Sequence, residues 1–184
     1  PGGDTCASME SLRVGVVGGG DIARHDHLPA YASDDRTAVV ALAEVNAERR
    51  REVCREYGIT TGYADGIEML ESESLDVVSI CTPVTTHESL FVRAAEQGSA
   101  VYCEKPFAPT LDSAKRMAEA AAAAGVVTQA GYKYRLTRNF QRVLELHNSG
   151  VLGEIQHVST SFHSFPITKG WYHNKSFPGG GIVM

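Results

Sequence analysis

The first segment of the sequence that could do chemistry is a glycine-rich turn. Residues 18–23 read GGGDIA, which fits the pattern Gly-x-Gly-x-x-Ala, and they directly follow an apolar run that ends at Val17. In such a turn Gly18 lets the chain leave a strand sharply, Gly20 keeps a side chain out of the path of a diphosphate, and Ala23 lets a helix pack closely on the strand. The first amides of that helix would face the phosphates. We therefore predict a dinucleotide site that includes Gly18, Gly20, Asp21 and Ile22.

An acidic residue ends the next apolar run. Glu44 lies about 20 residues after the predicted helix begins, where a carboxylate accepts hydrogen bonds from the adenosine ribose and repels a 2′-phosphate. This position favours NAD over NADP. Arg49, Arg50 and Arg51 follow closely, and one of them could reach a 2′-phosphate, so NADP stays an alternative. A further alternative is that Glu44 is a solvated acid that binds no ligand.

Two further strand ends carry polar residues. Thr82-Pro83 follows one apolar run and Glu104-Lys105-Pro106 the next, and ligands of a doubly wound sheet bind beyond the carboxyl ends of its strands. Thr82 could contact the nicotinamide ribose, and we expect His87, at the start of the following helix, to face the same crevice. Lys105 is the candidate catalytic residue, because an amine there could hold a substrate hydroxyl and exchange its proton during hydride transfer. On the residues alone, an ordinary surface lysine is the alternative. Glu104 would position that lysine or bind it in an ordinary ion pair.

These residues need a parallel sheet to bring them together. Near-continuous apolar runs alternate with helix-like segments between residues 12 and 130, which is typical of an α/β fold with a doubly wound parallel sheet of the Rossmann type. Gly58, Gly98 and Gly125 each follow a predicted helix, where a left-handed C-terminal cap is favoured. The predicted strands are Leu12–Val17, Ala38–Ala43, Leu75–Cys81, Ala100–Cys103 and Val126–Gln129, and the predicted helices are Ile22–Ala32, Ala47–Tyr57, Asp65–Glu71, Thr86–Gln97 and Leu111–Ala124.

The pattern changes after Gly131. Arg138–Asn148 predicts an amphipathic helix, and Glu154–Phe165 alternates as a strand does. One helix and one strand cannot bury their own apolar faces, so this segment either pairs with another chain or belongs to a longer protein. We favour the second and expect residues 131–184 to begin a second α/β domain with a mixed open sheet. Residues 1–11 predict a disordered leader, which leaves 12–130 as the dinucleotide-binding domain.

The composition is that of an ordinary globular protein. The chain has 184 residues, of which 43% are hydrophobic and 21% charged, with a formal net charge of −5. Neither a nucleic acid nor a membrane is expected as a partner, because basic residues are scattered and no apolar run approaches the ~20 residues that span a bilayer. The four cysteines show no C-x-x-C pair and no zinc spacing, so we expect no metal site, and buried free thiols in a cytoplasmic protein.

Together the motifs resemble those of the Gfo/Idh/MocA family, named after glucose–fructose oxidoreductase and inositol dehydrogenase. The resemblance covers about residues 12–184, and the Glu104-Lys105-Pro106 tripeptide is its most specific element. It implies a Rossmann domain, then an α/β domain whose open sheet often forms an oligomer interface, and NAD(P)-dependent oxidation or reduction of sugars, inositols or related cyclic alcohols. The matching segments are GGGDIA at 18–23, Glu44, DVVSICTP at 76–83 with His87, Glu104-Lys105-Pro106, Gly131-Tyr132-x-Tyr134-Arg135, Gly150-x-x-Gly153-Glu154-Ile155, Trp171 and Gly179-Gly180-Gly181.

By position, the resemblance also assigns roles. Lys105 is similar to the family's substrate-binding and proton-handling lysine. The positions similar to the cofactor pocket are Thr82, Pro83, His87 and Glu104. The positions similar to residues near the nicotinamide and substrate are Tyr132, Arg135 and Trp171. Most relatives carry Asp where this chain has Glu44, which weakens the preference for NAD. Relatives also continue past the triple glycine into a helix with an Asp and a His, beyond the last residue here, Met184.

The resulting expectation is an NAD(P)-dependent oxidoreductase that transfers hydride between nicotinamide and a polyhydroxylated small molecule. A homo-oligomer is implied for the whole protein, and little turnover is expected of this chain alone. An NAD-dependent glycoside hydrolase of the same fold and a non-catalytic dinucleotide sensor remain alternatives. Sugar release without accumulation of NADH would indicate the hydrolase, and the retained Lys105 argues against the sensor.

Overall fold

A six-stranded parallel sheet forms the centre of the molecule. The computed structural model describes residues 10–161, and its strands lie in the order β3-β2-β1-β4-β5-β6. All neighbouring strands are parallel, and the strand order reverses between β1 and β4, which is where ligands of such sheets bind. The strands are β1 (Leu12–Val17), β2 (Thr37–Ala43), β3 (Thr61–Tyr63), β4 (Val77–Ile80), β5 (Ala100–Cys103) and β6 (Thr128–Ala130).

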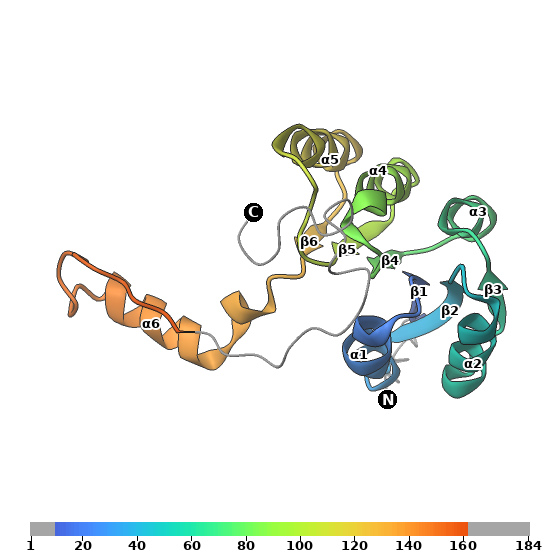
Figure 1. The fold of residues 1–184 in the computed structure, drawn as a ribbon, viewed down its shortest axis with the longest axis horizontal. Helices are drawn as coiled ribbons and strands as arrows, with labels where there is room; N and C mark the ends of the chain where they lie inside the picture. Colours follow the sequence, from blue (N-terminus) through green and yellow to red (C-terminus); the bar gives the residue numbers. More distant parts are fainter. Residues whose placement is uncertain (1–9, 162–184) are drawn as a thin grey trace, which may run out of the picture.

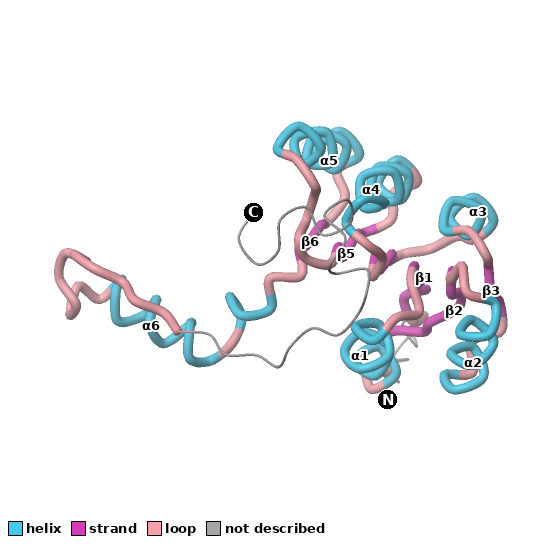
Figure 2. Tube along the Cα trace, viewed as in Figure 1, coloured by secondary structure: helices cyan, strands magenta, loops and turns pink. Residues whose placement is uncertain are grey.

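Helices cover both faces of this sheet. In Figure 1, α1 and α2 lie on one face and α3, α4 and α5 on the other, which confirms the predicted doubly wound α/β architecture. Strand and helix alternate along the chain up to β6 (Figure 2). A π-helical turn, Ala23–His27, runs directly into α1, so one continuous helix follows the glycine-rich turn. The α-helices are α1 (Leu28–Ala32), α2 (Ala47–Tyr57), α3 (Gly66–Ser72), α4 (His87–Glu96), α5 (Leu111–Ala124) and α6 (Arg138–Asn148).

Apolar residues of β1 contribute to both faces of the sheet. Val14 and Val16 pack in one cluster with Leu28 of α1, whereas Val17 belongs to the cluster that contains Phe91 of α4. Each of these five side chains is at most 3% exposed. A strand that is buried on both faces needs apolar residues at nearly every position, which explains why the buried part of β1, residues 14–17, carries no polar side chain.

Most predicted elements have nearly the predicted bounds. The short edge strand β3 was not predicted, because its three residues, Thr-Gly-Tyr, form no apolar run. The strand predicted over Glu154–Phe165 is wrong in its described part. Residues 155–161 lie in neither a helix nor a strand, and no strand within residues 10–161 pairs with them, so their backbone groups lack the ladder that a strand requires. The remainder, 162–165, lies outside the described residues.

Helix α6 is present as predicted and lies away from the sheet (Figure 1). Its apolar residues Phe140, Val143 and Leu144 are 52%, 55% and 48% exposed. The apolar face of α6 is therefore exposed, which is what its sequence pattern predicted. Within residues 10–161, no helix combines the length and apolar character needed to cross a bilayer.

The described cysteines differ in burial, which allows a test of the packing. Burial raises the pKa of the Cys103 thiol to about 12 and also raises that of Cys81, so at pH 8 Cys103 is almost entirely the unreactive thiol. We expect a disulfide reagent at pH 8 to label the half-buried Cys54 in the native protein and the buried Cys103 only after denaturation. Cys81, which is also half-buried but has a raised pKa, should react more slowly than Cys54. Peptide mapping of the labelled sites measures this. Labelling of native Cys103 as fast as Cys54 would contradict the packing.

Candidate active site

Three predicted segments meet at one edge of the sheet. Val17 pairs with Ile80, and Ile80 pairs with Cys103, so the residues that follow these three lie side by side at the carboxyl ends of β1, β4 and β5. Hydrogen bonds extend the pairing one step further, from the Cys81 amide to the Val17 carbonyl at 2.7 Å and from the Glu104 amide to the Ile80 carbonyl at 2.9 Å. The parallel sheet therefore places the glycine-rich turn beside Thr82, with Lys105 one strand further along the same edge.

The first and third glycines of the turn serve different purposes. Gly18 has a φ of +94°, and a Cβ there would lie 2.8 Å from the Cys81 carbonyl oxygen, so the fold itself requires glycine. At Gly20 no described atom lies within 4 Å of the position that a Cβ would occupy. The fold leaves this space open, which fits the close approach of a diphosphate.

The helix that follows the turn begins without a side-chain cap. Asp21 and Ile22 are already helical, and the Arg24 amide donates a hydrogen bond to the Gly20 carbonyl at 3.0 Å, so the N-cap residue is Gly20, which has no side chain to accept from the first amides. Helices α2, α3 and α5 are instead capped by the side chains of Asn46, Asp65 and Thr110. The residues at the turn thus fit the phosphates of a dinucleotide, which would accept hydrogen bonds from the first amides of the helix.

Glu44 lies beside the glycine-rich turn, at the predicted strand end. Its carboxylate accepts hydrogen bonds from the Gly19 amide at 2.9 Å and from the Asn46 amide at 2.8 Å, and Glu44 is only 6% exposed. The guanidinium of Arg49 lies 3.6 Å from the same carboxylate. The reading of Glu44 as a merely solvated acid is therefore wrong, because it binds the turn. Each carboxylate oxygen retains a further lone pair for a ribose hydroxyl.

His87 does not face an open crevice, and this expectation is corrected. The side chain is fully buried, with Nε2 2.9 Å from the Thr82 carbonyl oxygen and Nδ1 3.2 Å from the Phe107 carbonyl oxygen. His87 therefore joins the loop after β4 to the loop after β5 from within. The Thr82 hydroxyl accepts a hydrogen bond from Thr86 at 2.8 Å, and Pro83 begins the 3₁₀ turn that leads into α4.

Lys105 and Glu104 lie in different environments although they are adjacent. Lys105 is exposed, and within residues 10–161 no carboxylate lies at salt-bridge distance from its ammonium. Glu104 is 8% exposed and accepts hydrogen bonds from His27 at 3.0 Å and from the Lys105 amide at 3.1 Å. Glu104 thus contacts the backbone of Lys105 and leaves the ammonium available to a substrate. The expected alternative of an ordinary ion pair between them is wrong.

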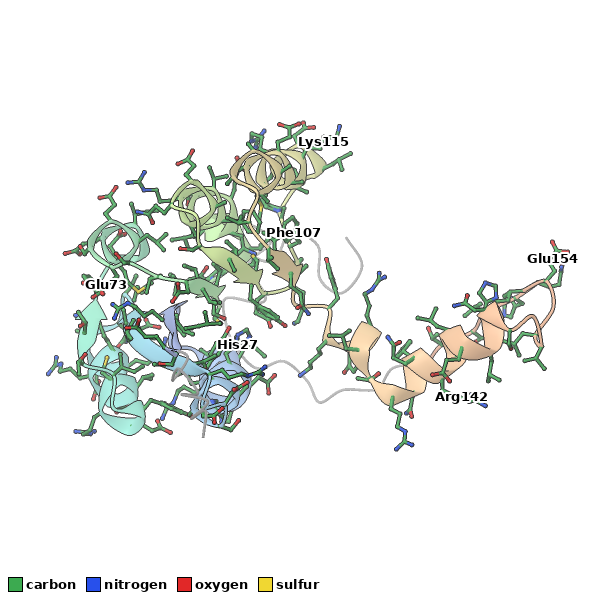
Figure 3. The ribbon with its side chains drawn as sticks, turned by 180° about the vertical axis from the view of Figure 1, so that it is seen from behind. His27, Glu73, Phe107, Lys115, Arg142 and Glu154 are labelled. Atoms are coloured by element: carbon green, nitrogen blue, oxygen red, sulfur yellow. The ribbon has the colours of Figure 1, made fainter. Side chains whose placement is uncertain are left out.

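Sequence reasoning missed His27. It is 8% exposed and bridges the Ser79 hydroxyl and the Glu104 carboxylate. Figure 3 labels His27 where the α1 segment meets the sheet. The available signal was its spacing, because residues four apart share a helix face and Ala23, four residues earlier, was already predicted to pack on the sheet.

Two of the predicted substrate residues lie on the segment that follows the last strand of the sheet. Tyr132 and Arg135 follow β6 on the segment that leads to α6, and Tyr132 is 50% exposed. Lys133 between them forms an ion pair of 3.0 Å with Asp26, which ties this segment to the helix after the glycine-rich turn. Trp171 lies outside the described residues. Across residues 10–161 no cluster of His, Cys, Asp and Glu suited to a metal ion is present.

Comparison with known proteins agrees with the geometry. Residues 12–132 match the model of a family described as an oxidoreductase family with an NAD-binding Rossmann fold. Myo-inositol 2-dehydrogenase of Thermotoga maritima is 31% identical over 143 residues, which are 78% of this chain and 42% of that protein. The chain spans about half the length of the curated relatives it matches.

Two solved structures share the fold and were determined with nicotinamide dinucleotides. The WlbA dehydrogenase from Bordetella pertussis, in complex with NADH and UDP-GlcNAcA, has a TM-score of 0.73 at 27% identity, over 78% of this chain and 44% of that one. A 3-ketoreductase from Actinomadura kijaniata, in complex with TDP-benzene and NADP, has a TM-score of 0.71 at 27% identity, over 80% and 46%. By its matched residues, its sheet and its relatives, the chain belongs to the Gfo/Idh/MocA family of oxidoreductases.

Proposed function

We propose that the protein is an NAD(P)-dependent oxidoreductase that transfers hydride between nicotinamide and a carbon that bears a hydroxyl in a sugar, an inositol or a related cyclic polyol. The observation that carries the proposal is the open space at Gly20, which lies at the same edge of the sheet as an exposed lysine two strands away. A diphosphate in that space would direct the rest of the dinucleotide across the strand ends toward Lys105. The names of the relatives support the substrate class.

In this proposal each residue has one task. The glycine-rich turn and the helix after it bind the diphosphate, and Glu44 binds the adenosine ribose. Thr82 and Pro83 shape the pocket wall beside the nicotinamide, which when bound supplies the hydride-transfer chemistry. As a neutral amine, Lys105 accepts the proton of the substrate hydroxyl while the carbon is oxidised and becomes an ammonium, and on reduction the ammonium returns that proton to the oxygen. Tyr132 and Arg135 contact the substrate, and Trp171, which lies outside the described residues, is assigned to the substrate by the resemblance alone.

The direct test has two measurements on the intact gene product. Calorimetry should show one NADH site per chain, and a panel of sugars, inositols and sugar nucleotides should include a substrate that reduces NAD or NADP with a matching loss of hydroxyl. A protein that binds no dinucleotide would overturn the proposal. Binding without reduction of the dinucleotide by any polyol would favour a sensor, and glycoside cleavage without accumulation of NADH would favour a hydrolase.

For the choice of cofactor, we propose NAD over NADP. The Glu44 carboxylate lies beside the turn, where it would repel a 2′-phosphate, but Arg49 at 3.6 Å partly neutralises it. We expect Glu44→Gln to shift the ratio of the NADP and NAD dissociation constants toward NADP by about tenfold, or ~1.4 kcal/mol, and Arg49→Gln to shift it the other way. The ratio of the two dissociation constants is informative because a general distortion of the turn would weaken the binding of both cofactors.

The matched control for this measurement is Glu48→Gln. Glu48 is exposed on the first turn of α2, so the variant removes the same charge nearby without touching the glycine-rich turn. The ratio should stay within about twofold of the wild-type value, as screened surface charges contribute little. An equal shift in Glu48→Gln and Glu44→Gln would show that overall charge, and not Glu44, discriminates the cofactors.

The proposal extends to compartment and assembly. Cys54, Cys81 and Cys103 are free thiols, which supports a reducing compartment such as the cytoplasm. The uncovered apolar residues of α6 support burial of this segment in a second domain that takes part in a homo-oligomer. The boundary of that domain near residue 131 is part of the same proposal.

A further inference from the structure

A buried polar cluster joins the two halves of the proposed site. The imidazole of His27 lies with Nδ1 2.7 Å from the Ser79 hydroxyl and Nε2 3.0 Å from a Glu104 carboxylate oxygen. Its ring also packs edge-on against Tyr102, with ring centroids 5.0 Å apart. His27 and Glu104 are each 8% exposed, and Ser79 is fully buried. Polar groups are rarely buried at this depth without a structural or functional reason.

The protonation pattern of the cluster follows from Glu104. Burial raises the pKa of the Glu104 carboxyl, but hydrogen bonds from His27 and from the Lys105 amide outweigh burial and hold that pKa below its ordinary value. Glu104 is therefore a carboxylate at neutral pH, so His27 Nε2 carries a proton and donates it to the hydrogen bond. In the neutral imidazole Nδ1 then accepts a hydrogen bond from the Ser79 hydroxyl.

The order Ser–His–Glu is also found in hydrolytic triads, but this cluster cannot work as one. Ser79 lies within β4 and is 0% exposed, so its hydroxyl cannot reach a substrate. A nucleophile must contact the group that it attacks. The role of the cluster is therefore to position the residues around it.

Those residues belong to three segments of the proposed site. His27 lies in the π-helical turn of the helix that begins at the glycine-rich turn, and such turns often occur at functional sites. Glu104 accepts a hydrogen bond from the Lys105 amide at 3.1 Å. A Cβ on Gly131, just after β6, would lie 2.9 Å from the Glu104 carboxylate, so the carboxylate has little freedom to move. His27 is thus the connection between the diphosphate-binding helix and the backbone of Lys105.

We propose that His27 is a positioning residue that holds Glu104, and through it the Lys105 backbone, and that it couples dinucleotide binding at the glycine-rich turn to the order of Lys105. The coupling rests on the proposed function, whereas the hold on Glu104 does not. When the diphosphate fixes the helix, His27 is fixed with it, and the Glu104–Lys105 segment loses freedom to open. No proton transfer to substrate is assigned to His27.

The test compares two amide variants at this position. In His27→Asn the side-chain amide occupies the place of Nδ1 and can still form a hydrogen bond with the Ser79 hydroxyl, but it is too short to reach Glu104. In His27→Gln the side-chain amide reaches the place of Nε2 and donates to Glu104. Both variants are neutral and polar, and they differ in length by one methylene, so they separate the contact with Glu104 from general effects on folding. His147→Asn, at an exposed position on α6, is the control.

The readout is hydrogen exchange of the Lys105 amide, measured by NMR with and without NADH. We expect NADH to slow this exchange about tenfold in the wild type, in His27→Gln and in the control. In His27→Asn we expect exchange to be about tenfold faster without NADH and unaffected by it, while the Kd of NADH changes by less than about threefold. Turnover of the intact gene product should show a lower kcat for His27→Asn, restored in part by His27→Gln.

Each outcome bears on the proposal. Equal exchange of the Lys105 amide in His27→Asn and the wild type would overturn it, and so would equal impairment of His27→Asn and His27→Gln. If the wild type bound no NADH, the proposed function would fail, and the exchange rates without NADH would still test the hold of His27 on Glu104. If His27→Asn did not fold, Ser79→Ala, which loosens the imidazole from the other side, should raise Lys105 exchange to an intermediate rate, and no change would count against the proposal.

Discussion

Gly20→Ala should weaken NADH binding by at least about tenfold, ~1.4 kcal/mol, and leave the melting temperature within about 2 °C of the wild type. The fold does not use the space beside Gly20, since no described atom lies within 4 Å of the added Cβ. That methyl group would stand where a diphosphate approaches the turn. Calorimetric titration with NADH and thermal unfolding without ligand measure the two quantities, and Gly20→Val should enlarge the loss of affinity.

Gly18→Ala is the contrasting variant in the same turn. Its positive φ costs about 1–2 kcal/mol with a Cβ present, and the Cβ would overlap the Cys81 carbonyl at 2.8 Å, so its melting temperature should fall by several degrees, at about 2–4 °C per kcal/mol. The pair separates a glycine needed for folding from one needed for a ligand. Full NADH affinity in a stably folded Gly20→Ala would contradict the dinucleotide site.

Much of the fold could be predicted because its signals are local. An unbroken apolar strand, a helix with a cap at one end and a glycine at the other, and short connections follow from a few neighbouring residues each. β3 could not be predicted, because a three-residue edge strand forms through its pairing with β2 and has no apolar pattern of its own. The segment after Gly153 alternates as a strand does, yet strand formation depends on a partner that periodicity cannot supply.

For the candidate site, the positions of the residues could be predicted but the orientations of their side chains could not. The strand-end positions of Glu44, Thr82 and Lys105 could be predicted, because parallel strands end at a common edge. The directions of side chains could not. Glu44 turns back onto the glycine-rich turn, and His87 points inward to two carbonyl oxygens. The spacing of His27 from Ala23 could have indicated that it faces the sheet, but its partners lie 52 and 77 residues away in sequence, which no local pattern contains.

Lys105→Met should lower kcat of the intact gene product by about 10²–10⁴-fold, the usual range for loss of an acid–base group, and change the Kd of NADH by less than about threefold. Methionine keeps most of the unbranched stem and removes the amine. The buried neighbour Glu104 is bonded to the Lys105 backbone amide and not to its ammonium, so the loop should stay in place. Steady-state kinetics with the substrate found by the panel, beside NADH titration, measure both effects.

Lys105→Arg refines the same prediction. Arginine keeps the positive charge and can bind a hydroxyl oxygen, but it does not give up a proton in proteins. The KM of the substrate should therefore be close to the wild-type value while kcat stays low, which assigns proton transfer, and not only binding, to Lys105. Lys115→Met, on the exposed face of α5 (Figure 3), removes a lysine at a distance from the strand ends and should leave both constants unchanged. If Lys105→Met lost NADH binding and turnover to the same extent, Lys105 would be a cofactor-binding residue, and the hydroxyl proton would have to pass to another group.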